Sequence, residues 1–94
     1  IIRATSINGS PTTIAAGGFL GSPTTTTVTF SVPNAVESLH GNVIINPQFD
    51  FPEALSIISS RVSSDGTVRV VFVNTGSSYS ISGSSKRFDI TVIQ

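Results

Sequence analysis

The chain has 94 residues, with five basic and five acidic side chains and a formal net charge of +0 at pH 7. This length allows one domain with a single core, and the lack of cysteine excludes a disulfide framework and a thiolate metal site. There is no run of Lys or Arg and no apolar run near the ~20 residues of a membrane span. We therefore expect neither a nucleic-acid partner nor a membrane partner.

The composition favours β-structure over helices. Ser and Thr make up roughly 30% of the chain, above their average share, and Met and Trp are missing. Hydroxyl-rich, β-branched sequence punctuated by Gly and Pro is typical of all-β domains. A net charge near zero does not oppose close association of copies, so we expect a homo-oligomer, with a trimer as the specific hypothesis and a polar monomer as the alternative.

The first residues predict a strand followed by a turn. Residues 1–7 alternate apolar and polar side chains and lead to Asn8-Gly9, a dipeptide that favours tight hairpins. Pro11 has no N–H for a β-ladder. We therefore expect the continuation after this turn to lie at a sheet edge or outside the sheet.

A small-residue stretch then carries an isolated apolar pair, Phe19 and Leu20. This pair either plugs the end of its own sandwich or packs, with the rest of the N-terminal segment, on a neighbouring subunit. We divide the chain accordingly into an N-terminal arm or hairpin, residues 1–23, and a β-sandwich domain, residues 24–94.

The remainder reads as short strands separated by turn signals. Residues 54–74 predict a long hairpin about Asp65-Gly66, because Asp tolerates positive φ and Gly adopts it without strain. Six or seven strands of this kind predict an all-β fold, a single antiparallel β-sandwich that is jelly-roll-like or immunoglobulin-like. The apolar positions that we expect to define its strands are Val28, Phe30 and Val32; Leu55, Ile57 and Ile58 leading to Val62; Val68, Val70 and Phe72; and Phe88, Ile90 and Val92.

Two aromatic residues, Phe49 and Phe51, lie close together in a loop that begins after Pro47. Alternation places both rings on one side of the chain, with Asp50 on the other. Two roles are open: the rings cap the end of the sandwich, or they form an exposed patch for a partner.

No stretch has the pattern of a catalytic or metal site. His40 is the only histidine, and Glu37 alone beside it makes a poor ligand set. The sequence has no G-x-S-x-G elbow and no Gly-rich phosphate loop with its Lys. Asp50 and Glu53 are more simply solvated loop carboxylates, and Tyr79 alone is a thin platform for a sugar. We therefore expect a non-enzymatic protein with no cofactor and no metal.

From Thr27 onward the order of pieces resembles a small β-sandwich module found in virion proteins of tailed bacteriophages. In such modules a strand ending in Val-Pro is followed by a Gly-led strand ending in Pro, a Leu-Pro-x-x-Leu type turn, an Arg-Val strand and Asn-Thr-Gly after the hairpin. The matching pieces here are T-V-T-F-S-V-P-N-A, G-N-V-I-I-N-P, Phe51-Pro52-Glu53-Ala54-Leu55, Arg61-Val62, Asn74-Thr75-Gly76 and the final R-F-D-I-T-V-I. Residues 1–26 lie outside the resemblance.

The resemblance implies a structural virion protein, assembled in the host cytoplasm. Our expectation is a capsid decoration (cement) protein that binds the major capsid protein or another virion protein and stabilises contacts between capsomers. The alternatives are a tail or fibre module and a carbohydrate-binding accessory domain. The residues that we expect to contact the partner are the apolar ones of the arm and the aromatic loop, namely Ile1, Ile2, Ile7, Phe19, Leu20, Phe49 and Phe51.

Overall fold

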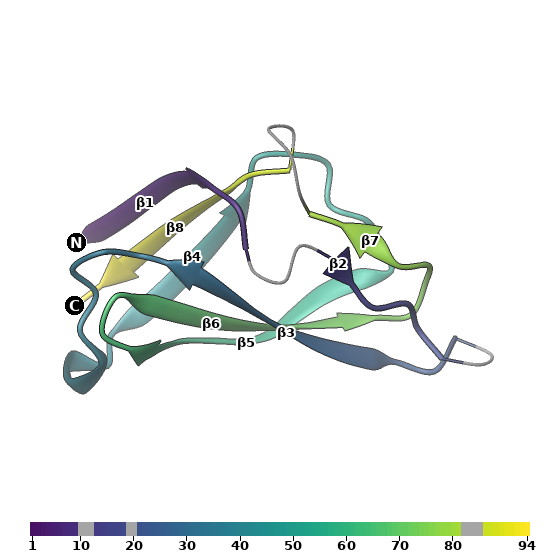
Figure 1. The fold of residues 1–94 in the computed structure, drawn as a ribbon, viewed down its shortest axis with the longest axis horizontal. Coiled ribbons are helices and arrows are strands. Elements are labelled where there is room, and N and C mark those ends of the chain that lie inside the picture. The colour runs from purple at the N-terminus through teal and green to yellow at the C-terminus, as the bar shows by residue number, and fades with distance from the viewer. Residues whose placement is uncertain (10–12, 19–20, 82–85) are drawn as a thin grey trace.

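The computed structural model of this chain describes residues 1–9, 13–18, 21–81 and 86–94. Over this part of the chain the fold is all-β, which confirms the predicted antiparallel sandwich (Figure 1). One three-stranded sheet has the order β1-β8-β4, the other has the order β3-β6-β5, and β2 and β7 form a two-stranded pair. The bounds are β1 Ile2–Ile7, β2 Thr13–Ile14, β3 Thr24–Ser31, β4 Asn42–Pro47, β5 Leu55–Ser64, β6 Thr67–Asn74, β7 Tyr79–Ser80 and β8 Phe88–Ile93, with a 3-10 turn, η2, at Glu37–Leu39.

The core lies between the two sheets and follows the predicted alternation. Each central strand turns every second side chain inward, because successive residues of a strand point to opposite faces. The inward residues are all fully buried: Val68, Val70 and Phe72 from β6, and Phe88, Ile90 and Val92 from β8. Burying each of them stabilises the fold by about 1.5–3 kcal/mol before the entropy cost of ordering is counted.

The β5–β6 hairpin contains a register shift that explains why Ile58 is exposed. Ile57 pairs with Phe72 and Ser59 pairs with Val71, so Ile58 is an extra residue in β5. A one-residue bulge reverses which positions face inward. Leu55 and Ile57 therefore face the core before the bulge, Val62 faces it afterwards, and Ile58 itself is 58% exposed.

The hairpin turn differs from the expected mirror-image turn. Gly66 has φ of +78°, whereas Asn34 and His40 are the only non-glycine residues with positive φ in the described chain, so Asp65 does not have it. The ladder also shifts between Val62 and Ser64. A left-handed glycine beside a register shift is a bulged turn. A hydrogen bond connects the tip of this turn to the chain after β3: the Glu37 backbone amide donates to Asp65 Oδ1 at 3.0 Å.

Asn8-Gly9 does not form the predicted hairpin. β1 pairs with β8 and β2 pairs with β7, so the two segments do not pair with each other. Gly9 has no positive φ; it is buried where its backbone crosses Val28 and Phe30, too close for a side chain. Asn8 donates from its amide to Ile81 O at 2.9 Å. The dipeptide thus supports a close backbone crossing rather than a turn.

Buried Asn74 joins three segments at the end of β6. Its amide nitrogen donates to Ala15 O at 3.0 Å and to Ser77 O at 2.8 Å, and its amide oxygen accepts from Gly76 N at 2.9 Å. Asn74 is only 2% exposed, so these bonds satisfy an amide side chain that water does not reach. The side chain therefore holds residues 13–18 against the sandwich.

We expect Asn74→Ala to lower the free energy of unfolding by about 2–3 kcal/mol, because it removes three hydrogen bonds made by a buried side chain. The measurement is urea unfolding followed by circular dichroism. Asn46→Ala, at an exposed position of β4, is the matched control and should change stability by no more than about 0.5 kcal/mol. Equal midpoints for the two variants would contradict the role given to Asn74.

Gly9→Ala should destabilise the protein by about 1–3 kcal/mol through overpacking, because the added methyl group meets Val28 and Phe30. Gly18→Ala is the control, since its methyl group would lie 3.2 Å from Ser22 Cβ at an exposed position. Thermal unfolding of both variants tests this, and a Gly9→Ala protein as stable as the control would show that the crossing has room for a side chain.

Candidate partner-binding groove

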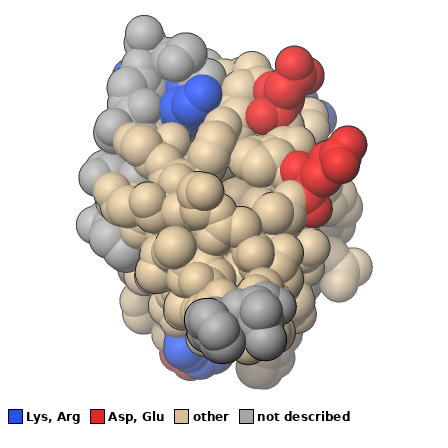
Figure 2. All heavy atoms as spheres, turned by 90° about the vertical axis from the view of Figure 1, so that its right-hand side faces the viewer, with Lys and Arg blue, Asp and Glu red and all other residues tan. Residues whose placement is uncertain are grey.

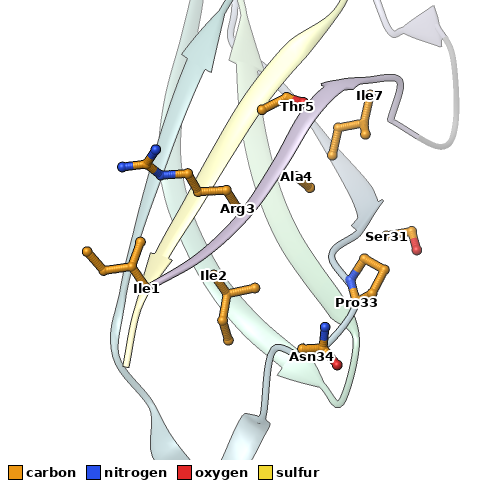
Figure 3. Close-up of a pocket in the computed structure, with 9 residues that line it drawn as sticks. All are labelled: Ile1, Ile2, Arg3, Ala4, Thr5, Ile7, Ser31, Pro33 and Asn34. Carbon is orange, nitrogen blue, oxygen red and sulfur yellow. The ribbon is translucent and has the colours of Figure 1, made fainter.

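Three of the predicted contact residues, Ile1, Ile2 and Ile7, line one groove (Figure 3). The groove has a volume of about 570 Å³ and lies where β1 of one sheet approaches the end of β3 of the other. Figure 3 shows Ile2, Ala4 and Ile7 on the side of β1 that faces the end of β3, and Ile1, Arg3 and Thr5 on the other side of the strand. The lining residues are Ile1, Ile2, Arg3, Ala4, Thr5, Ile7, Ser31, Pro33 and Asn34.

The groove exists because β1 and β3 are edge strands. β8 is the only described strand that pairs with β1, and β6 is the only one that pairs with β3. The outer edge of β1 therefore has backbone N–H and C=O groups with no strand partner in the described chain, and such an edge can accept a further strand. Figure 1 shows β1 at the margin of the molecule.

A register shift sets which β1 side chains face the groove. Ala4 pairs with Ile90 and Ile7 pairs with Phe88, so one extra residue lies between them. Because of this shift, Ile2, Ala4 and Ile7 all face the second sheet, and Ile2 and Ile7 pack partly buried against the core. The groove therefore has an apolar floor.

The rim of the groove is polar and carries few charges. Ser31 and Asn34 are exposed on the side of β3, and Arg3 and Thr5 are exposed on the outer side of β1. Ile1, at the end of the groove, is 77% exposed. An apolar floor, a hydroxyl and amide rim and a free strand edge together suit an extended peptide better than a charged ligand.

Phe49 and Phe51 lie elsewhere and pack as a cap on the core. The Phe49 ring meets the Phe88 ring edge to face, with centroids 5.3 Å apart, and the Phe51 ring lies 6.1 Å from that of Phe72. Both residues are half-buried. Of the two roles left open by the sequence, these contacts correspond to the cap.

Tyr79 is part of the same aromatic cluster. Its ring stacks on Phe49 with centroids 6.2 Å apart and an interplanar angle of 19°. Lys86 Nζ lies 5.3 Å from the Tyr79 centroid and 5.6 Å from that of Phe49. The ring is thus engaged within the protein, and this arrangement gives no support to Tyr79 as an open sugar platform.

The other predicted positions do not assemble into a site. Phe19 and Leu20 lie outside the described residues. His40 follows η2 and is exposed. In the described chain no three His, Cys, Asp or Glu residues gather as metal ligands, and no helix is long and apolar enough to cross a membrane. Figure 2 shows that the end of the sandwich beside β2 and β7 is mostly uncharged.

Two exposed isoleucines on the outer face of the β1-β8-β4 sheet were not among the predicted contact residues. Ile44 of β4 is 50% exposed and Ile93 of β8 is 44% exposed. Ile93 pairs with Asn42, which places Ile44 diagonally across from it. The alternation of β8, with Phe88, Ile90 and Val92 inward, already placed Ile93 outward; the position of Ile44 beside it depends on strand pairing.

Comparisons with protein-family models, with curated proteins and with solved structures found no significant match to this chain.

Phe49→Ala should lower the free energy of unfolding by about 2–4 kcal/mol, because it removes a ring that contacts Phe88, Phe51 and Tyr79. Ile44→Ala, a truncation at an exposed apolar position, should change it by no more than about 0.5 kcal/mol. Denaturant unfolding measures both. If Phe49→Ala were as stable as the wild type, the ring would be a surface group and not a cap.

Proposed function

We propose that this chain is a non-enzymatic structural protein of a phage particle that binds a neighbouring virion protein through the groove and free edge of β1. The form we favour is a capsid decoration protein bound to the major capsid protein. The observation that supports this most directly is the groove beside an edge strand, whose mixed lining includes the apolar side chains of Ile1, Ile2 and Ile7.

The proposed contact is strand addition. An extended segment of the partner pairs with the outer edge of β1, and its alternate side chains enter the groove over Ile2 and Ala4. Burying an exposed side chain such as Ile1 contributes about 1.5–3 kcal/mol, which is modest for a single contact. Repetition of the contact over a symmetric shell multiplies the effective affinity through avidity.

The resemblance and the groove support different parts of this proposal. The residues that resemble phage modules, such as Arg61-Val62 and Asn74-Thr75-Gly76, belong to the β5–β6 hairpin and its continuation. They account for the scaffold. β1 lies outside the resemblance, which fits a division between a shared sandwich and an edge strand specific to its own partner.

A homo-oligomer, with a trimer as the specific form, is a separate part of the proposal. Light scattering over a concentration series gives the mass of the particle in solution. A trimer fits a symmetric accessory or a fibre module, whereas a monomer would remove the self-association and leave the contact with a different virion protein.

Binding is tested with purified particles of the phage whose genome encodes this chain. Mass spectrometry should find the chain in those particles, and particles stripped of it should take up added protein in a sedimentation assay. Absence of the chain from purified particles would overturn the virion assignment itself.

Ile1→Asp should weaken this uptake by roughly tenfold or more, because it places a charge at an apolar contact. Ile58→Asp makes the same chemical change on β5 of the other sheet, at a position that is 58% exposed and does not line the groove, and should bind as the wild type does. Both positions are exposed, so both variants should fold. Equal binding by Ile1→Asp and the wild type would exclude the groove as the contact, even if the chain is a virion protein.

A further inference from the structure

The outer face of the β3-β6-β5 sheet carries two arginines directly opposite each other. Arg61 of β5 pairs with Arg69 of β6, and Arg69 pairs on its other side with Thr29 of β3. Both arginines are exposed. In the described chain neither guanidinium has a carboxylate partner, so two like charges face solvent side by side.

Hydroxyl groups surround this pair. On one side, the next row of the sheet holds Thr67 paired with Ser64. On the other side, Val71 lies between Thr27 and Ser59. None of these outward positions is acidic and none is aromatic. The face therefore offers two guanidinium groups flanked by hydroxyl donors and acceptors, with the exposed side chain of Ile58 next to Ser59.

Like charges directly opposite on neighbouring strands repel each other, and a bound anion relieves that repulsion. A guanidinium donates two parallel hydrogen bonds to a carboxylate, sulfate or phosphate group, which makes Arg suited to planar recognition of such anions. The pairing of Arg61 with Arg69 thus points to an oxyanion as the complementary group.

We propose that this face binds an acidic polysaccharide. The Arg61–Arg69 pair takes a carboxylate or sulfate group of the polymer. The flanking Ser and Thr side chains, such as Ser64 and Thr67, exchange hydrogen bonds with sugar hydroxyls. Because the face is a sheet surface rather than a cavity, it suits a chain that extends across several strands, with the arginines at its centre.

The composition of the face favours a polysaccharide over other polyanions. Protein interfaces are enriched in aromatic residues as well as in Arg, and they are depleted in Ser; this surface has Arg and many Ser and Thr but no aromatic residue. Nucleic acids are held through many phosphate contacts and by stacking on aromatic rings. This face offers two arginines and no aromatic residue. Neither arginine lines the groove beside β1, so variants of Arg61 and Arg69 test this proposal without changing the proposed contact through β1.

The test measures binding of the intact chain to four polymers by surface plasmon resonance at low salt. The probes are heparin as a sulfated polysaccharide, polygalacturonate as a carboxylated one, neutral dextran and polyglutamate. We expect binding to heparin or polygalacturonate, and weaker binding to dextran and polyglutamate.

Arg61→Gln/Arg69→Gln should weaken polysaccharide binding by roughly tenfold or more, because two charge-assisted contacts are lost. The matched control is Lys86→Gln/Arg87→Gln, which lowers the net charge equally but acts next to β8, in the other sheet. Arg61→Lys/Arg69→Lys keeps the positive charges but removes the planar guanidinium groups that can donate two parallel hydrogen bonds. This variant should therefore bind the polysaccharide with intermediate affinity.

Three results would overturn the proposal. The first is no binding to either acidic polysaccharide. The second is equal loss of binding in the arginine variant and in its charge-matched control, which would indicate general electrostatic attraction. The third is polyglutamate binding as tight as that of the polysaccharides, which would identify an acidic protein as the partner.

Discussion

Phe88 is fully buried where the two sheets meet, and its ring contacts Phe30 and Phe72 of the opposite sheet, with centroids 5.1 and 6.2 Å apart. A three-stranded sheet with one apolar face is stable only when another layer covers that face. Phe88 belongs to β8, the central strand of its sheet, so the same contact positions β1 and β4 on either side of it. The location of the groove beside β1 follows from this packing.

Register shifts allow strands whose apolar residues do not alternate perfectly to turn these residues toward the core. Without the extra residue at Ile58, Val62 would face solvent whenever Leu55 and Ile57 faced the core. The shift in β1 does the same for Ile7 relative to Ala4. In β1 the shift also places three apolar side chains along the seam between the sheets. The register shift that lets Ile7 pack against the core therefore also forms the apolar floor of the surface groove.

The two sheets present chemically different outer surfaces. The β1-β8-β4 sheet carries the exposed isoleucines Ile44 and Ile93, and the β3-β6-β5 sheet carries hydroxyl groups around Arg61 and Arg69, with Ile58 as its one large exposed apolar side chain among the described residues. The scaffold between them is closed by buried polar contacts, above all those of Asn74. A rigid sandwich of this kind can hold separate partners on separate faces, because neither surface takes part in the core that keeps the sheets together.

The fold class, the inward residues of the central strands and the position of the long hairpin could all be predicted from the sequence, because alternation and turn residues act over a few positions. The groove could be predicted only as a set of apolar residues near the N-terminus. Its location required the pairing of β1 with β8, which joins the two ends of the chain and leaves no local signal. The burial of Gly9 and the opposition of Arg61 and Arg69 were likewise decided by tertiary structure, since both depend on which strands meet and in which register.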